Sequence, residues 1–314
     1  MNEYGAKGIP FWFMVDFEMQ QPLVIPSAKV DAYSILYDLE GFRNYKIADP
    51  ISDNHYFRLK EAVSLERYSA AFNYCNQQLM LGNSYLLNLT FPSEIETDLS
   101  LKEIFHRSQS KYKLWYKDEL LCFSPETFIK IADGKIYSFP MKGTIDASIP
   151  HAQEIMLNDE KETAEHYTIV DLIRNDLSMV AEKVKVEQFR YIDEIATNNK
   201  KLLQVSSKIS GILPKDYACR IGEILYTLLP AGSVSGAPKK KTLEIIQQAE
   251  NYKRGYYTGV FGHFDGVNLI SAVMIRFIEK IDGKLYYKSG GGITTRSNLH
   301  NEYQELLNKI YLPA

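Results

Sequence analysis

The stretch TFIKIADGKIYSF, residues 127–139, decides how this chain folds. Its two halves are rich in Ile, Phe and Tyr, and Asp133-Gly134 stands between them. An Asp-Gly pair between apolar runs is a strong hairpin signal, because both residues tolerate the positive φ that a tight turn requires. Two further pairs, Asp265-Gly266 and Asp282-Gly283, interrupt similar runs. The three pairs together predict antiparallel β-sheet rather than parallel βαβ units.

Helices are expected between these hairpins. Apolar residues recur at helical spacing after Glu66, and Gly82-Asn83 ends that helix before the strand SYLLNLTF. Further helices are expected over residues 159–182, 217–229, 239–251 and 299–311. Short strands are expected near the N-terminus, in PFWFMVDFE, QPLVIP and YKIADP. Strand hairpins separated by blocks of helices indicate an α+β fold.

The composition indicates a globular chain of one large domain or two modest ones, with 314 residues, of which 45% are hydrophobic and 24% charged. The net charge of -3 shows no basic footprint, so neither nucleic acid nor an anionic membrane is expected as a partner. No window approaches the roughly 18 apolar residues of a membrane span. The three cysteines, Cys75, Cys122 and Cys219, form no CxxC pair, which suits a reducing, cytoplasmic location.

Two helical segments each carry two glutamates three residues apart. These are Glu162 with Glu165, and Glu302 with Glu305. Residues i and i+3 share one helix face, so two such faces could together hold a hard cation such as Mg2+ through oxygen ligands. The alternative is a solvated acidic face, which is the commoner outcome for such a pair taken alone. A glutamate near a helix start is also favoured by the helix dipole.

Two glycine-rich segments offer a similar choice. In GSVSGAPKKKTLEII, residues 232–246, backbone N–H groups before a helix could bind an anion. Alternatively, Ser235 caps that helix and Pro238 lies in its first turn. In SGGGITTRS, residues 289–297, three glycines after a strand would allow a ligand to come close, or would form a flexible loop.

Three charged residues stand in apolar surroundings. Arg276 lies in SAVMIRF, where a charge on an apolar strand needs a carboxylate from a ligand or from the protein. Glu126 and Lys142 could lie on neighbouring strands and divide the roles of acid and nucleophile, or they could form a surface ion pair. By its local sequence, Lys142 in YSFPMKGTID could also be no more than a charge in a turn.

Taken together and in order, these segments resemble the chorismate-utilising enzymes, which include anthranilate, aminodeoxychorismate, isochorismate and salicylate synthases. The matching segments span residues 124–309 and read SPETF, FPMKGTI, EKETAEHYTIVDLIRNDL, GSVSGAPKKKTLEII, RGYYTGVFG, VMIRF and GGGITTRSNLHNEYQELLNK. The resemblance implies a single-domain α+β sandwich of two antiparallel β-sheets flanked by helices, like anthranilate synthase component I. It implies a short N-terminal segment, residues 1–65, packed on a chorismate-binding catalytic core, residues 66–314.

The resemblance also implies the residues of a site between the sheets. Lys142 and Glu126 would be catalytic. A Mg2+ ion would be held by glutamates, with Glu165 and Glu305 favoured as direct ligands beside Glu162 and Glu302. The residues implied in substrate binding are Thr144, Gly232, Ser233, Tyr257, Arg276, Gly290, Gly291, Gly292 and Lys309.

Three positions discriminate between members of this family. Anthranilate synthases usually carry alanine where Lys142 stands, whereas aminodeoxychorismate synthases carry a lysine that acts on the chorismate ring. Isochorismate and salicylate synthases use a different lysine, at the position of Leu86 in this sequence. Gln204 stands where anthranilate synthases often have a histidine. The resemblance therefore implies component I of aminodeoxychorismate synthase, which makes 4-amino-4-deoxychorismate, the precursor of p-aminobenzoate and folate.

In the implied reaction, neutral Lys142 attacks ring carbon C2 while Glu126 protonates the departing C4 hydroxyl. Ammonia then adds at C4 and the lysine leaves. A free lysine has a pKa of about 10.4, so a desolvated site beside a divalent cation is expected to lower the pKa of Lys142.

The implied partners are chorismate and ammonia. No amidotransferase or lyase motif is recognisable, so a glutamine amidotransferase subunit is expected to supply the ammonia and a separate aminodeoxychorismate lyase to process the product. Three alternatives stay open at this stage: anthranilate synthase component I, isochorismate synthase, and a non-catalytic chorismate-binding subunit.

Overall fold

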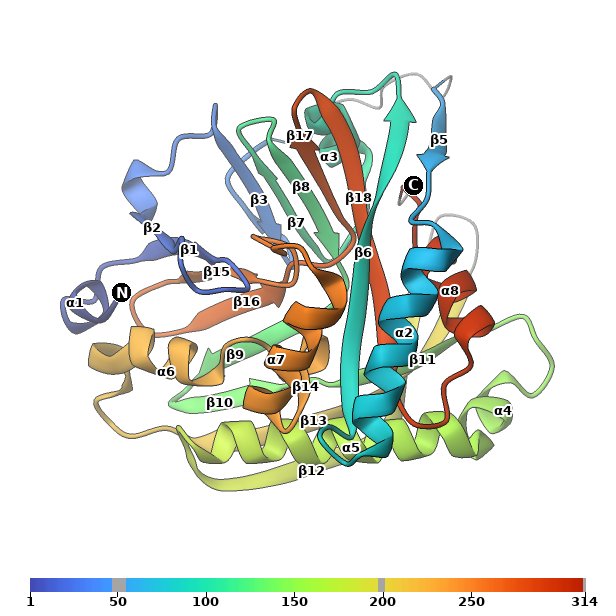
Figure 1. The fold of residues 1–314 in the computed structure, drawn as a ribbon. Coiled ribbons are helices and arrows are strands. Elements are labelled where there is room, and N and C mark those ends of the chain that lie inside the picture. Colours follow the sequence, from blue (N-terminus) through green and yellow to red (C-terminus); the bar gives the residue numbers. More distant parts are fainter. Residues whose placement is uncertain (47–54, 197–200, 313–314) are drawn as a thin grey trace.

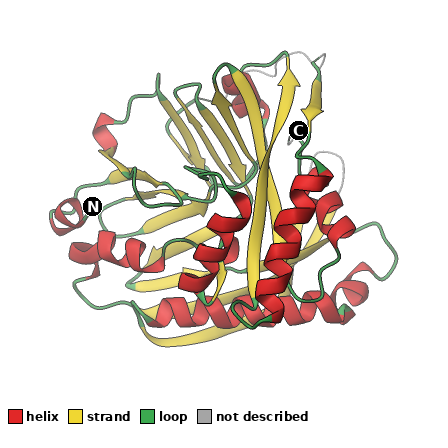
Figure 2. Cartoon of the chain, in the orientation of Figure 1, coloured by secondary structure: helices red, strands yellow, loops and turns green. Residues whose placement is uncertain are grey.

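The computed structural model describes residues 1–46, 55–196 and 201–312. In this part of the chain, two nine-stranded sheets lie face to face, and every strand pairing is antiparallel. Helices cover the outer faces of both sheets (Figures 1 and 2). The α+β fold predicted from the hairpins and the two-sheet sandwich implied by the family resemblance are both confirmed.

The first sheet, here called sheet A, contains the Asp133-Gly134 and Asp265-Gly266 hairpins. Its strands are β1 (Phe11–Val15), β2 (Leu23–Pro26), β9 (Thr127–Ala132), β10 (Lys135–Ser138), β11 (Met141–Asp146), β12 (Glu182–Ala196), β13 (Lys201–Ile212), β15 (Val260–Phe264) and β16 (Leu269–Val273). Their order is β11-β13-β10-β9-β16-β15-β1-β2, and β12 also pairs with β13.

The second sheet, sheet B, contains the Asp282-Gly283 hairpin. Its strands are β3 (Ile35–Leu39), β4 (Phe42–Arg43), β5 (Phe57–Glu61), β6 (Leu86–Thr97), β7 (Tyr112–Tyr116), β8 (Leu120–Ser124), β14 (Gly236–Ala237), β17 (Phe277–Ile281) and β18 (Lys284–Ile293). Their order is β14-β6-β18-β17-β8-β7-β3-β4, and β5 also pairs with β6.

The helices occupy most of the ranges that were expected. They are α1 (Asn2–Ala6), α2 (Leu65–Met80), α3 (Leu101–Arg107), α4 (Ala152–Asn158), α5 (Glu160–Ser178), α6 (Ile221–Leu228), α7 (Lys239–Glu250) and α8 (Leu299–Asn308), with short 3-10 helices η1 (Ser27–Lys29), η2 (Tyr217–Arg220) and η3 (Gly232–Val234). The helix expected to reach residue 182 ends at Ser178, because β12 begins at Glu182. Helices α1, α3 and α4 were not expected. For α3 a signal existed: Ser100 and Glu103 form a capping box.

Strand β1 shows why the N-terminal run FWFMV is apolar throughout. Phe11, Phe13 and Val15 pack in the cluster that includes the residues of α5 and α6, outside sheet A. Trp12 and Met14 face the opposite way and pack against residues of sheet B. A strand that is buried on both faces needs no polar alternation. β1 and β3 also show that N-terminal residues contribute strands to both sheets, whereas the division at residue 65 stays a prediction.

Two of the three Asp-Gly pairs form tight two-residue turns. Asp133 and Gly134 have φ values of 53° and 72°, and Asp282 and Gly283 have 50° and 79°. Positive φ at both positions is the type I′ pattern that matches the twist of paired strands. The third hairpin has a longer turn, residues 265–268, in which the Asp265 carboxylate accepts hydrogen bonds from the N–H groups of the last two residues.

Two of the segments where the chain passes from one sheet to the other lie side by side, and they carry two of the charged residues singled out above. Glu126 lies between β8 and β9, and Arg276 lies between β16 and β17. The two crossovers are joined by backbone hydrogen bonds from Phe123 N to Arg276 O and from Val273 N to Glu126 O, both 3.1 Å. Two expectations are therefore wrong. Arg276 is not inside a strand, and β9 is separated from the strand of Lys142 by β10 and β13.

The glycines of SGGGITTRS are part of a regular strand. Gly290–Gly292 belong to β18 and pair with residues 88–90 of β6. The alternative of a flexible loop is excluded for these three residues.

The other glycine-rich segment brings the chain against β6. Gly236 pairs with Leu87, and a Cβ added to Gly236 would lie only 1.9 Å from the carbonyl oxygen of Leu86. One alternative proposed that Ser235 caps the following helix, and the structure excludes it. The Ser235 hydroxyl donates to the carbonyl of Ala231, and Pro238 occupies the N-cap position of α7.

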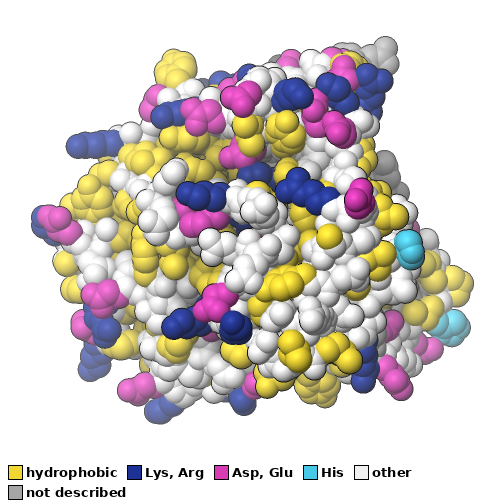
Figure 3. Space-filling view, viewed as in Figure 1, with side chains coloured by type: hydrophobic (Ala, Val, Ile, Leu, Met, Phe, Trp, Pro, Cys, Tyr) yellow, Lys and Arg dark blue, Asp and Glu magenta, His cyan; other side chains and the backbone are white. Residues whose placement is uncertain are grey.

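Three smaller observations complete the comparison. Most of the strand expected at YKIADP falls outside the described residues. None of the helices in the described ranges is long and apolar enough to cross a membrane. Acidic and basic side chains are interspersed on the face seen in Figure 3.

Candidate active site

Lys142 and Glu165 form the centre of the candidate site. Lys142 is in β11, and its Nζ donates to Glu165 Oε2 at 2.9 Å. Glu165 lies in α5, whose N-terminus is capped by the Asp159 carboxylate, which accepts a hydrogen bond from the N–H of Glu162 at 2.8 Å. A Cβ on Gly143 would lie 3.4 Å from Glu162 Oε2. The acidic face of α5 therefore lies against β11 at this glycine.

The second pair of glutamates reaches the same region from α8. Asn298 caps this helix, because its side chain accepts hydrogen bonds from two backbone N–H groups of the first turn. A Cβ on Gly291 would lie 3.3 Å from Glu305 Oε1 and 3.6 Å from Glu302 Oε2. Both helical carboxylate pairs therefore border the strands of the site, as the i and i+3 spacing predicted.

The amine of Lys142 reaches from sheet A to sheet B. A Cβ on Gly292 would lie 3.3 Å from Lys142 Nζ and 3.2 Å from Leu86 Cδ1. The two positions that discriminate between family members, 142 and 86, therefore flank one glycine. Because Gly292 has no side chain, the amine can stand close to this strand.

The carboxylates set the charge of Lys142. Burial lowers the pKa of its ammonium group, but Glu165, Glu162 and Glu305 raise it by more, so the pKa lies above its ordinary value. The expected lowering of the Lys142 pKa is not what these residues produce. Without a cation among the carboxylates, Lys142 is an ammonium ion.

The four glutamates have the ligand chemistry that Mg2+ prefers, which is carboxylate oxygen. Two of them are engaged by lysines: Glu165 by Lys142 and Glu305 by Lys309. Within the described ranges, no three His, Cys, Asp or Glu side chains converge closely enough to hold a metal as they stand. The donor set fits Mg2+, and magnesium binding stays a prediction.

Lys309 ties α8 to the glycine strand. Its Nζ donates to the carbonyl of Gly290 at 2.8 Å and to Glu305 Oε1 at 2.7 Å. Burial lowers the pKa of Lys309, and the opposing effect of Glu305 is smaller. The cation holds the end of α8 against the predicted substrate-binding backbone.

Glu126 is the carboxyl group best suited to carry a proton. Burial raises its pKa, and the opposing effects of a hydrogen bond from Ser233 and of the charges on Lys142 and Arg276 are smaller. The Ser233 hydroxyl donates to Glu126 Oε1. The adjoining Gly232 helps to line a cavity of about 30 Å³ next to Glu126.

Arg276 and Tyr257 lie behind this carboxyl group. Arg276 Nε donates to the hydroxyl of Tyr311 at 3.2 Å, and its guanidinium lies over that ring. Among the described residues, the partner of Arg276 is thus a tyrosine rather than a protein carboxylate, and the alternative of a ligand carboxylate stays a prediction. Tyr257 is buried against Phe277, and burial raises the pKa of its phenol. The backbone of Thr144 is paired with β13, and its side chain lies outside what the structure describes.

Sequence reasoning missed two residues on the other side of Lys142. His166 and Arg190 contribute to a cavity of about 200 Å³, which is lined by Lys142, Gly143, Ile145, Ile155, Met156, Asp159, Glu162, His166, Arg190 and Val205. His166 Nε2 is bonded to Ser207 Oγ at 2.7 Å. Burial lowers the pKa of His166 to about 4, aided by Arg190 and Lys142, so the imidazole is neutral. No spacing pattern indicated that these two residues line one cavity, because Arg190 belongs to strand β12, which was not expected.

Comparison with known proteins supports the arrangement. Residues 24–313 match the family model described as chorismate binding enzyme. An uncharacterized PabA-like protein of Haemophilus influenzae is 53% identical over 99% of this chain and 94% of its own length. Aminodeoxychorismate synthase component 1 of Klebsiella aerogenes is 30% identical over 79% of this chain and 57% of its own length.

A solved structure gives the same result for the fold. The crystal structure of anthranilate synthase component I from Streptococcus pneumoniae superposes with a TM-score of 0.69 at 25% identity. The match covers 81% of this chain and 58% of the other. Relatives with different names thus share this sandwich, so the activity must be argued from the site.

Proposed function

The chain belongs to the chorismate-binding enzyme family, and on that premise we propose that it is component I of aminodeoxychorismate synthase. It would convert chorismate and ammonia to 4-amino-4-deoxychorismate, for p-aminobenzoate and folate synthesis. Folds of this kind host several reactions, so the proposal depends on residues rather than on architecture.

The observation that carries the proposal is the position of Lys142. Its amine lies next to Gly292 of the opposite sheet, and Leu86 lies beside the same glycine. A lysine at 142 with a leucine at 86 places an amine at the position implied for attack on the ring and an apolar side chain at the position implied for activation of water. This combination supports amination of the ring over the isochorismate-type reaction.

The reaction divides between Lys142 and Glu126. The Lys142 amine forms a bond to ring carbon C2 while the C4 hydroxyl leaves as water with a proton from the Glu126 carboxyl group. Ammonia then bonds to C4 as the Lys142–C2 bond breaks and the amine of Lys142 leaves with its electron pair, and the surplus proton of the new C4 ammonium group passes to the Glu126 carboxylate. The raised pKa of Glu126, caused by its burial, supports its role as the acid.

Lys142 must lose a proton before it can attack, and the carboxylates around it oppose that loss. When bound to Glu165, Glu305 and their neighbours, Mg2+ would neutralise these carboxylates and a carboxylate of the substrate, and so would remove their stabilisation of the ammonium ion. Arg276, Lys309 and the Gly290–Gly292 backbone would bind the remaining anionic groups of chorismate.

We further propose that a glutamine amidotransferase subunit supplies the ammonia, and that a separate lyase converts the product to p-aminobenzoate in the cytoplasm. The printed name of the Haemophilus relative, PabA-like, supports an amidotransferase connection. All three cysteines are unpaired, as suits a reducing compartment.

The proposal is tested by incubating the protein with chorismate, Mg2+ and an ammonium salt, and identifying the product by mass. We expect 4-amino-4-deoxychorismate, without anthranilate fluorescence. Immediate formation of anthranilate, or of isochorismate, would replace the proposal with one of the other family activities. Chorismate binding without turnover, also after addition of a glutaminase subunit, would indicate a non-catalytic subunit.

A further inference from the structure

An ion pair that is almost completely buried adjoins the candidate site, and no step of the proposed mechanism involves it. Arg254 and Glu250 are each 1% exposed. Arg254 Nε donates to one oxygen of Glu250 at 2.9 Å, and its Nη2 donates to the other at 2.6 Å. In addition to this bidentate pairing, the same guanidinium donates three further hydrogen bonds.

The three remaining contacts go to three separate chain segments. Nη1 donates to the carbonyl of Val234 at 2.8 Å and to the Thr258 hydroxyl at 3.2 Å, and Nη2 donates to the carbonyl of Asn88 at 2.6 Å. Arg254 thereby connects η3, the turn before β15, and β6. A planar fork can do this, because its donors point in fixed and different directions.

Each of these acceptors is next to a residue of the candidate site. Val234 follows Ser233, which donates to Glu126. Thr258 follows Tyr257. Asn88 is paired with Gly292, the glycine beside Lys142. One buried guanidinium therefore fixes the neighbours of three predicted substrate-binding residues.

The link also extends to the crossover that carries Arg276. Thr258 has a φ of 61°, which is strained for a β-branched residue and needs support from its surroundings. Its N–H donates to the carbonyl of Met274 at 2.8 Å, and the N–H of Met274 donates to Gly259 at 2.7 Å. The contact from Arg254 to the Thr258 hydroxyl thus supports the turn on which Arg276 depends.

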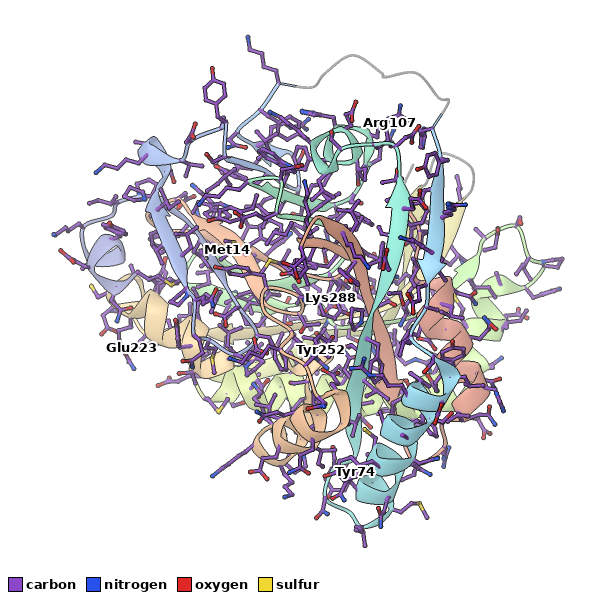
Figure 4. The ribbon with its side chains drawn as sticks, turned by 45° about the horizontal axis from the view of Figure 1, so that its top comes forward. Met14, Tyr74, Arg107, Glu223, Tyr252 and Lys288 are labelled. Atoms are coloured by element: carbon purple, nitrogen blue, oxygen red, sulfur yellow. The ribbon has the colours of Figure 1, made fainter. Side chains whose placement is uncertain are left out.

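The surroundings hold Arg254 in place. Glu250 Oε1 also accepts from the N–H and the hydroxyl of Thr90, at 2.8 and 2.9 Å. The carbonyl of Arg254 accepts from Lys288 Nζ at 2.9 Å, and that amine lies over the ring of Tyr252. Lys288 and Tyr252 are labelled near the centre of Figure 4. Every donor of this guanidinium has a specific acceptor at a defined distance.

We propose that Arg254 is the positioning residue of this site, and that its guanidinium sets the placement of Ser233, Tyr257 and Gly292 relative to one another. The inference rests on the proposed function, since it concerns the same substrate site. Arg254 does not contact the reacting atoms in this account. It acts through the three segments that it joins.

The test compares Arg254→Lys with Ser233→Ala in the assay with chorismate and ammonium. Arg254→Lys keeps the charge but cannot reach all the acceptors, so we expect kcat/KM for chorismate to fall on the order of tenfold to a hundredfold. The alkaline limb of the pH profile should move to higher pH, as in Ser233→Ala, because the Ser233 hydrogen bond lowers the pKa of Glu126. The double variant should be at most about twofold slower than the more impaired single variant. The reason is that both substitutions disturb the same hydrogen bond, from Ser233 to Glu126.

A matched control separates positioning from stability. Lys113 is another buried cation, which donates to the carbonyls of Phe105 and Ser108 beside α3. We expect Lys113→Met to lower the melting temperature without moving kcat/KM or the pH profile below that temperature. If Arg254→Lys behaves like Lys113→Met, or if the defects of Arg254→Lys and Ser233→Ala multiply, the proposal is wrong.

Two further measurements keep the proposal testable. If Arg254→Lys does not fold, Glu250→Gln weakens the pairing while keeping the shape, and should lower kcat/KM in the same direction by a smaller factor. Chorismate affinity, measured by calorimetry, needs no turnover. A protein that binds chorismate without producing the amine contradicts the proposed function, whereas equal affinity in the native protein and in Arg254→Lys contradicts the positioning role.

Discussion

Two ion pairs, Arg254–Glu250 and Lys142–Glu165, lie in the same sandwich and differ in how deeply they are buried and in what surrounds them. The side chains of the first pair are each 1% exposed, and those of the second are 25% and 9% exposed. The first guanidinium donates to acceptors on four segments, which it holds together. In the second pair, Lys142 lines a cavity, and the further carboxylates of Glu162 and Glu305 act on it. An ion pair whose donors all have acceptors within the protein holds the structure in place. An ion pair beside a cavity and additional carboxylates can rearrange when a ligand binds.

The largest expected effect concerns the open pair. Lys142→Ala should reduce ammonia-dependent turnover on the order of a thousandfold or more, because it removes the attacking amine. The rate of product formation in the assay with chorismate and ammonium measures this loss. Lys208→Ala is the matched control, since Lys208 is a lysine of the same sheet that pairs with Glu187 away from the site. Unchanged turnover in Lys142→Ala would eliminate the nucleophile role.

The second prediction applies one substitution to both pairs. Arg254→Met should lower the free energy of unfolding by about 3–5 kcal/mol, because it leaves Glu250 buried and unpaired. Lys142→Met should cost only about 1–2 kcal/mol, because Lys142 is itself 25% exposed and lines a cavity, so that less desolvated charge interaction is lost. Urea denaturation curves measure both values. Equal losses would show that the two pairs do not differ in the way described here.

The third prediction concerns His166, beside the open pair. Its pKa is lowered from the usual 6.5 to about 4, mainly by burial. The unfolded chain therefore binds more protons than the folded one between these values, so stability is complete above about pH 6.5 and is lost as the pH falls toward 4. The loss should be on the order of 2–3 kcal/mol.

The same prediction has a direct control. Denaturation measured from pH 7 down to pH 4 should show a flatter dependence for His166→Gln than for the native protein. His151→Gln changes an exposed histidine, whose side chain is 74% exposed, and should leave the curve as it is. A steep dependence that persists in His166→Gln would assign the effect to other groups.

The smallest expected effect is that of magnesium on stability. If the acidic pairs bind Mg2+, free Mg2+ at ten times its dissociation constant should stabilise the folded protein by about 1.4 kcal/mol, and a chelator should reverse this. Thermal unfolding with increasing Mg2+ measures the shift. Glu165→Gln and Glu305→Gln should each weaken it, whereas Glu223→Gln, at an exposed pair on α6, should not. A shift that is identical in all three variants would exclude these ligands.

Much of the fold was readable from local chemistry. The Asp-Gly pairs predicted the three hairpins, and apolar spacing predicted α2, α5, α6, α7 and α8. The missed strand β12 alternates charged with apolar residues at a sheet edge and carries several register shifts, so its pattern is irregular. The alternative in which Ser235 caps a helix is excluded: Pro238 is the N-cap of α7, and the glycine after Ser235 pairs with β6, a contact that no local pattern records.

The candidate site was readable in part. The spacing of Glu162 with Glu165 and of Glu302 with Glu305 predicted two acidic helix faces, and the structure places one beside the strand of Lys142 and the other beside the glycine strand, while their role as metal ligands stays a prediction. Arg254 was present in the motif RGYYTGVFG but received no role. Its importance depends on acceptors at residues 88, 234 and 258, which are adjacent to it only in space.

By itself, the sequence determined the elements that local geometry controls: where turns form, which helix faces are acidic, and which residue stands at the discriminating positions 142 and 86. Only the tertiary structure decided that Glu126 and Arg276 meet at two crossovers, that the carboxylates raise the pKa of Lys142 rather than lower it, and that Arg254 joins three parts of the site. The physical reason is that charge interactions and burial depend on distances between residues far apart in the chain, which no local spacing contains.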